Sequence, residues 1–128
     1  MELSQDDADL YESARAAAAR AYAPYSGFAV GAALRAADGT VYSAVNVENA
    51  SYGLTSCAER NALFAVVSAG SRDLESIAIH ADAATVPPCG ACRQVLAELA
   101  PELRVIWRRA GVPVVSSLAE RLPERFSL

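Results

Sequence analysis

Two short stretches, Pro88-Cys89-Gly90-Ala91-Cys92 and the earlier Cys57-Ala58-Glu59-Arg60, contain all three cysteines of this 128-residue chain. The two-residue gap between Cys89 and Cys92 allows both sulfurs to reach one metal ion from a single turn at the start of a helix. An odd number of cysteines argues against a disulfide framework and favours metal binding or nucleophilic chemistry. We therefore predict a metal site made of Cys57, Cys89 and Cys92.

Three thiolates leave one corner of a zinc tetrahedron open, and an open corner is typical of catalytic zinc sites. Glu59 follows Cys57 closely, so its carboxylate can take a proton from water at the metal and pass it to a substrate. The order Cys-x-Glu and then Pro-Cys-x-x-Cys is typical of zinc-dependent deaminases in their three-cysteine form. Three negative sulfurs also need a balancing charge, and we expect Arg60 to donate a hydrogen bond to one of them.

Two other interpretations of these residues remain open. Ser56 and Glu59 have the Ser-x-x-Glu spacing of a helix capping box, which is a structural device. His80, the one histidine, is the rival for the fourth corner of the metal site. With His80 bound, the site would be closed and the chain would be a non-catalytic, zinc-stabilised interaction domain. We expect His80 instead to be an ordinary residue at the end of a strand.

The composition is that of a globular protein, and its length fits one domain over 1–128. Hydrophobic residues make up 53% of the chain and charged residues 20%, with a formal net charge of −4. The only adjacent arginines are Arg108 and Arg109, so the chain lacks the basic surface that nucleic-acid binding needs. No run of about 20 apolar residues is present, so we expect no membrane contact. The acidic start Met1–Asp7 favours a cytoplasmic location over secretion.

The order of the expected helices and strands predicts the class of the fold. Ser4 and Asp7 predict the start of an alanine-rich helix that runs to about Ala21. The expected later elements are strands over 28–36 and 40–46 joined through Asp38-Gly39, a helix over 57–69 capped by Ser56, a strand over 76–80, a helix over 89–99, strands over 104–107 and 112–115, and a helical turn over 117–122. This order predicts an α/β fold in which one mixed sheet has helices on both faces.

Longer stretches of the sequence resemble the small, homotetrameric cytidine deaminases. These stretches are Pro24-Tyr25-Ser26, Phe28–Leu34, Asn46–Thr55, Cys57–Arg60, Pro88–Leu96, and Leu122-Pro123 with Phe126. The resemblance covers nearly the whole chain and implies a three-layer α/β/α fold with a five-stranded mixed sheet. It further implies a Zn²⁺ cofactor and a homotetramer whose sites are shared between subunits. The implied reaction is hydrolytic deamination of cytidine and deoxycytidine to uridine and deoxyuridine with release of ammonia, a step of pyrimidine salvage.

The resemblance also implies which residues bind the nucleoside. Asn46 and Glu48 are expected to hold the ribose 3′-hydroxyl as hydrogen-bond donor and acceptor. A contact to that hydroxyl predicts that deoxycytidine, which lacks only the 2′-hydroxyl, is also a substrate. Phe28 is expected to pack against the pyrimidine, and Ala58 to line the nucleoside site.

Two further residues are implied to act between subunits. Tyr52 and Phe126 are expected to contribute to the nucleoside site of a neighbouring subunit. The nearest alternative activity is deamination of another aminopyrimidine nucleoside, such as blasticidin S. The run Asn46–Ala50 favours plain nucleosides over that alternative.

Overall fold

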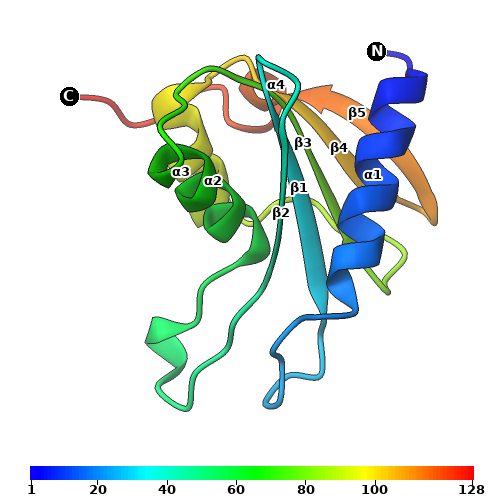
Figure 1. Ribbon diagram of the computed structural model, residues 1–128, viewed down its shortest axis with the longest axis vertical. Helices are drawn as coiled ribbons and strands as arrows, with labels where there is room; N and C mark the ends of the chain where they lie inside the picture. The colour runs from blue at the N-terminus through cyan, green and yellow to red at the C-terminus, as the bar shows by residue number, and fades with distance from the viewer.

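One five-stranded sheet lies between two layers of helix in the computed structural model, which describes residues 1–128 (Figure 1). The elements are α1 (Gln5–Ala18), β1 (Val30–Ala36), β2 (Val41–Val45), the 3₁₀ turn η1 (Tyr52–Leu54), α2 (Ala58–Ser68), β3 (Leu74–Ala81), α3 (Gly90–Leu99), β4 (Arg104–Arg109), β5 (Val112–Ser117) and α4 (Leu118–Arg121). The strands are ordered β2-β1-β3-β4-β5. Only β3 and β4 are parallel, so the predicted mixed sheet is confirmed. No helix has the length and apolar character needed to cross a membrane.

Helix α1 begins at the predicted capping box and is held against the sheet by the same aspartate. The Ser4 hydroxyl accepts from the Asp7 N–H at 3.1 Å, and Asp7 accepts from the Ser4 N–H at 2.8 Å. Asp7 also pairs with Arg104 of β4, at 2.6 Å between Oδ2 and Nη2. The helix ends at Ala18 rather than at the predicted Ala21, because the chain leaves it to bring Tyr22 into pairing with residues 46–48.

Helix α1 covers one face of the sheet, whereas α2 and α3 cover the other (Figure 1). The central strand β3 is buried on both faces, so its residues form an apolar run instead of an alternating pattern. Ile77 and Ile79 belong to the larger core, which lies against α2 and α3. Ala78 belongs to the smaller core under α1, with Leu10. Both cysteine-bearing helices therefore lie on the same face of the sheet.

Several strand boundaries differ from the predicted ones: among them, β1 begins later than predicted, and β4 and β5 extend further. Strand β1 begins at Val30 rather than Phe28, because the Asn46 side chain bonds Phe28 O and Val30 N–H in place of a neighbouring strand. Strands β4 and β5 run to Arg109 and Ser117, because they pair along their whole length.

Gly31 allows the close approach of β1 and α1, and this contact yields a prediction. A methyl group at Gly31 would overlap the backbone oxygen of Ala14 and lie 2.6 Å from Ala18 N. We expect Gly31→Ala to lower the free energy of unfolding by at least about 2 kcal/mol, because two backbones would have to move apart. Urea denaturation measures this loss. Gly53→Ala is the matched control, since no atom lies within 4 Å of its added carbon, and a loss of similar size in that variant would contradict the close-approach argument.

Candidate metal centre and active site

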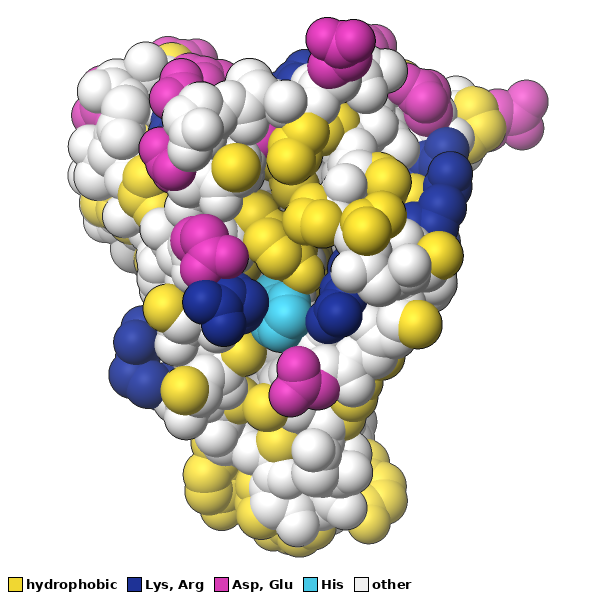
Figure 2. Space-filling view, turned by 90° about the vertical axis from the view of Figure 1, so that its right-hand side faces the viewer, with side chains coloured by type: hydrophobic (Ala, Val, Ile, Leu, Met, Phe, Trp, Pro, Cys, Tyr) yellow, Lys and Arg dark blue, Asp and Glu magenta, His cyan; other side chains and the backbone are white.

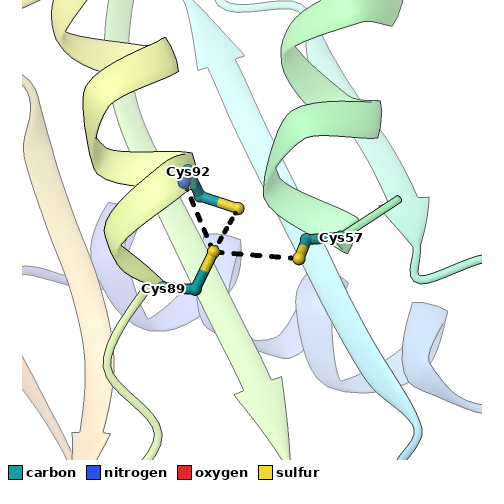
Figure 3. Close-up of side chains that lie close together, drawn as sticks. All are labelled: Cys57, Cys89 and Cys92. Carbon is teal, nitrogen blue, oxygen red and sulfur yellow. Dashed lines mark hydrogen bonds between the residues drawn. The ribbon is translucent and has the colours of Figure 1, made fainter. Parts of the chain in front are cut away.

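The three cysteines meet where the N-termini of α2 and α3 come together (Figure 3). Cys57 is the N-cap of α2, Cys89 is the N-cap of α3, and Cys92 lies in the first turn of α3. The sulfur of Cys89 lies 3.8 Å from that of Cys57 and 2.9 Å from that of Cys92. All three sulfurs lie within 4.8 Å of one another. The sequence prediction of one cysteine cluster is therefore confirmed.

The chemistry and spacing of these donors fit a zinc ion. Sulfurs bound to tetrahedral zinc at about 2.3 Å are about 3.8 Å apart, and the observed separations lie on both sides of that value. Burial, followed by the negative charge of Glu59, raises the pKa of the Cys92 thiol. Three thiolates at this place therefore require a cation, and a divalent metal both supplies the charge and deprotonates the thiols.

Arg60 and the helix termini balance the remaining negative charge. Arg60 donates a hydrogen bond from Nη2 to the Cys57 sulfur at 3.4 Å, and this bond raises the pKa of the guanidinium. The N–H of Cys92 points at the Cys89 sulfur at 3.3 Å. Positive helix ends and a cation both favour thiolate over thiol. The structure thus places Arg60 against the Cys57 sulfur, where the sequence predicted a hydrogen bond to a cysteine.

Glu59 is buried beside the cysteines and does not cap its own helix. Its side chain is 4% exposed, and Oε2 accepts a hydrogen bond from the Cys89 N–H at 3.3 Å. The capping-box interpretation of Ser56 and Glu59 is wrong, since the N-cap is Cys57. Ser56 is paired through its backbone N–H and C=O with Val47 instead, and its hydroxyl donates to Asn61.

His80 lies on the opposite face of the sheet from the cysteines. Its Nδ1 is hydrogen bonded to the Tyr11 hydroxyl of α1 at 2.6 Å. In Figure 2, which faces the α1 side, the single histidine lies between basic side chains. Burial, followed by the charge of Arg108, lowers the pKa of His80. His80 therefore cannot close the metal site, and the closed Cys₃His interpretation is excluded.

A cavity of about 260 Å³ opens beside the cysteine cluster. Five residues that the sequence pointed to line it together with Cys57 and Cys89, namely Phe28, Asn46, Glu48, Ala58 and Glu59. A second hollow of about 360 Å³ shares Ser26, Glu48 and Thr55 with this cavity. Two of the three cysteines, the buried carboxylate and four of the expected nucleoside residues thus line one cavity.

Asn46 and Glu48 are both held by the backbone at the entrance of β1. The Asn46 amide donates to Phe28 O at 2.8 Å and accepts from Val30 N–H at 2.9 Å. Glu48 accepts hydrogen bonds from the Ser26 hydroxyl and from the N–H groups of Tyr25 and Ser26. These bonds, that of the Ser26 hydroxyl first, lower the pKa of the Glu48 carboxyl. Each side chain keeps a free donor or lone pair for a ligand.

Neither Tyr52 nor Phe126 lines the cavity beside the cysteines of its own chain, although Tyr52 lines the second hollow. Tyr52 is 75% exposed and lies at the outer rim, edge-on to the Tyr25 ring. Phe126 is 70% exposed, and its backbone N–H and C=O are hydrogen bonded to the Gln94 side chain on α3. Both aromatic rings are therefore available for contacts outside this chain.

Sequence reasoning missed part of the cavity lining. The missed residues are Ser26, Val30, Thr55, Ile79, Val86 and Pro87. Ser26 had a signal, because it stands next to Tyr25 and Gly27 in a loop directly before the first predicted strand. Val86 had no local signal, because its place depends on a backbone bond to Arg108 in a distant strand.

Comparison with known proteins agrees with this site. The sequence model of the cytidine and deoxycytidylate deaminase zinc-binding region matches residues 4–107. This chain belongs to that family. A cytidine deaminase from Halalkalibacterium halodurans is 63% identical over 82 residues, which are 63% of this chain and 62% of that protein. One from Sporosarcina psychrophila is 51% identical over 121 residues, covering 92% of this chain and 89% of that protein.

The solved structures of the family extend the match to the fold. The crystal structure of a cytidine deaminase from Burkholderia pseudomallei has a TM-score of 0.89 and 48% sequence identity, covering 93% of this chain and 98% of that chain. A blasticidin-S deaminase from Bacillus cereus is less similar, at 30% identity over 98% of this chain and 95% of that protein. The five-stranded fold of the cytidine deaminases is therefore the fold of this chain, and its cofactor is zinc.

Metal content distinguishes a zinc site with an open fourth coordination position from one whose fourth ligand is His80. We expect His80→Ala to keep one zinc per chain, because the imidazole lies across the sheet from the sulfurs. We expect Cys89→Ser to lose most of the zinc, because the central sulfur of the cluster is removed. Metal analysis of the two purified variants after dialysis checks both expectations. Zinc lost from His80→Ala with its fold intact would revive the closed-site interpretation.

Proposed function

We propose that this chain hydrolyses cytidine and deoxycytidine to uridine and deoxyuridine, with release of ammonia. The observation that carries the proposal is one cavity lined by Cys57, Cys89 and the buried carboxylate of Glu59. Relatives named cytidine deaminases, 51% and 63% identical to this chain, support the choice of substrate. A reaction that replaces an amino group by water needs activated water and a group that moves protons, and this cavity offers both.

The proposed chemistry divides between a zinc ion and Glu59. Cys57, Cys89 and Cys92 would hold the zinc ion, which would supply activated water as the nucleophile near neutral pH. Glu59 accepts the proton that this water releases and delivers it to N3 of the pyrimidine as C4 is attacked. Glu59 then takes the proton of the new C4 hydroxyl and gives it to the amino group, so that ammonia leaves and the C4 carbonyl forms.

The Cys89 N–H holds Glu59 in place for these proton transfers. One carboxylate oxygen accepts this N–H at 3.3 Å, which leaves the other oxygen free to exchange protons. The carboxylate is also excluded from bulk solvent, at 4% exposure. A desolvated base with one oxygen fixed loses little orientational freedom when substrate binds.

The remaining cavity residues suit a nucleoside. Phe28 is 44% exposed and lines the cavity, where its ring can pack against a flat base. Asn46 and Glu48 line the same space, where a free amide N–H and a carboxylate lone pair can bind a sugar hydroxyl. The proposed sugar contact is to the 3′-hydroxyl, so removal of the 2′-hydroxyl should cost little affinity.

We also propose that the chain works as a homotetramer with shared sites. The exposed ring of Phe126 lines no part of its own cavity, and Tyr52 lies only in the second hollow, so both rings are free to contact the cavity of another copy. An apolar groove between α2 and α3, lined by Leu63, Phe64, Val67, Val95 and Leu99 among others, offers a surface for packing between copies. Phe64 is 50% exposed there, which is costly for a large aromatic residue left in water.

Turnover with a single substitution tests the reaction and the role of Glu59 together. We expect cytidine and deoxycytidine to give ammonia together with the ultraviolet shift to the uracil base. Glu59→Gln should keep zinc and fold but lose about 10²–10⁴-fold in kcat, because the amide cannot take up a proton. Steady-state assays of both proteins with metal analysis measure this. Near-normal turnover by Glu59→Gln would reject the mechanism, and no turnover by the unaltered protein would reject the substrate.

Shared sites predict recovery of activity in mixed assemblies. We expect Phe126→Ala to raise KM for cytidine about tenfold, because a neighbouring site loses an aromatic contact. When the Phe126→Ala chain is co-expressed with the Glu59→Gln chain, the mixed assembly should show a lower KM again. The Phe126→Ala chain supplies an intact Glu59, and the Glu59→Gln chain supplies Phe126 to that same site. Sedimentation of the mixture verifies that mixed tetramers form. Mixed tetramers whose KM stays high would contradict sharing of Phe126.

A further inference from the structure

The segment Asp82–Pro88 contains no helix or strand, yet it contributes to the lining of the cavity beside the cysteines, called the active cavity below. It connects β3 to α3 and is yellow-green in Figure 1. Val86 and Pro87 line the cavity, and the segment leads directly to Cys89. Such a connection is mobile unless its backbone groups are bonded to something rigid. The accuracy of the site therefore depends on what holds this segment.

The end of the β4–β5 hairpin, its turn and the last residues of β4, holds this segment. Three hydrogen bonds join the two: Val86 N–H to Arg108 O at 2.7 Å, Gly111 N–H to Ala84 O at 2.8 Å, and Ala110 N–H to the Thr85 hydroxyl at 3.1 Å. The Arg108 side chain adds a weaker bond to Ala81 O, at 3.4 Å, where the segment begins. Both ends of the exposed part of the segment are thus bonded to one short hairpin.

The hairpin turn is itself in a fixed conformation. Its two central residues, Ala110 and Gly111, have φ values of 49° and 84°. Two consecutive residues with positive φ form the tight turn that matches the twist of paired strands. The flanking residues Arg109 and Val112 are the last pair of the β4–β5 ladder. The turn is therefore a rigid extension of the sheet toward the active cavity.

Two prolines connect Val86 to Cys89, the residue whose N–H binds the Glu59 carboxylate. Only Pro87 and Pro88 separate Val86 from Cys89. Proline fixes its own φ, and Pro88 is fully buried, so this spacer has little freedom. The Cys89 N–H at its end is the group that holds Glu59 Oε2. A shift of the turn would therefore move both the cavity lining and the donor that orients Glu59.

We propose that the Ala110-Gly111 turn is a positioning element of the active site, acting through Val86 and the Cys89 N–H on Glu59. The inference rests on the proposed deamination and deepens it, because it names a part of the chain outside the cavity lining on which the rate depends. Neither residue of the turn lines the active cavity. Its effect on the reaction is transmitted only through the backbone of the Asp82–Pro88 segment.

Two glycines with nearly the same positive φ provide a matched test. Gly111 has φ 84° and Gly39, in the β1–β2 turn, has φ 91°, and an added Cβ meets no atom within 4 Å at either place. Valine is strained at both positions, because a β-branched residue rarely adopts positive φ. The Gly39 turn shares no hydrogen bond with the Asp82–Pro88 segment. Any cost of strain alone therefore appears in both variants.

We expect Gly111→Val and Gly39→Val to lose similar thermal stability and to keep zinc. Only Gly111→Val should lose about 10- to 100-fold in kcat/KM for cytidine, the usual effect of disturbing a partner of a catalytic group. It should also speed amide hydrogen exchange at Val86 and Cys89. In a Glu59→Gln background the same substitution should have a much smaller effect, since the turn acts through Glu59. Equal activity of the two valine variants, or additive losses in the double variant, would overturn the proposal.

A second pair of variants avoids backbone strain. Thr85→Val removes one of the three bonds to the hairpin and should reduce kcat/KM about two- to tenfold, as expected for one neutral hydrogen bond. Thr85→Ser keeps the hydroxyl and should restore the rate, and a Thr85→Ser as slow as Thr85→Val would contradict the inference. Should the unaltered protein release no ammonia from cytidine, the proposed function fails. In that case the amide hydrogen-exchange rates at Val86 and Cys89 still test whether the turn fixes the Asp82–Pro88 segment.

Discussion

The meeting of three sulfurs within 4.8 Å is the constraint on which the rest of the arrangement depends. Thiolates this close repel one another and are poorly solvated when buried, so they require a cation, positive helix ends and Arg60 around them. The two helix N-termini can meet only because α2 and α3 lie on one face of the sheet. The parallel pairing of β3 and β4, with its crossover through α3, places that helix there.

Once the helix ends meet, a single backbone amide links the cysteine cluster to the buried carboxylate of Glu59. The Cys89 N–H lies at 3.3 Å from Glu59 Oε2, although the two residues come from different helices. The sugar-binding candidates are fixed in a similar way, since Asn46 and Glu48 already bond the backbone around Phe28 and Ser26. Side chains held before substrate arrives lose less freedom on binding, so more of the interaction energy is available for affinity and rate.

The two faces of the sheet have separate roles. The face toward α2 and α3 carries the cysteines, Glu59 and the cavity, whereas the face toward α1 carries a small core and the Tyr11–His80 hydrogen bond. His80 is a metal-ligand type of residue, and only its place on β3 removes it from the metal chemistry. The exposed rings of Tyr52 and Phe126 similarly have a role in the proposed function only if several copies assemble.

Features that depend on a few neighbouring residues could be predicted from the sequence alone. The Ser4–Asp7 capping box, the Asp38-Gly39 hairpin, the helix after Cys89 and the cysteine cluster itself belong to this group, because their bonds join residues close in the chain or follow from ligand spacing. Only the tertiary structure decided the rest. Ser56 pairs with Val47 and so does not cap α2, and Val86 reaches the cavity because Arg108 binds it from another strand. Such bonds form between segments that are distant in the sequence and that only the fold brings together, so no local sequence pattern could predict them.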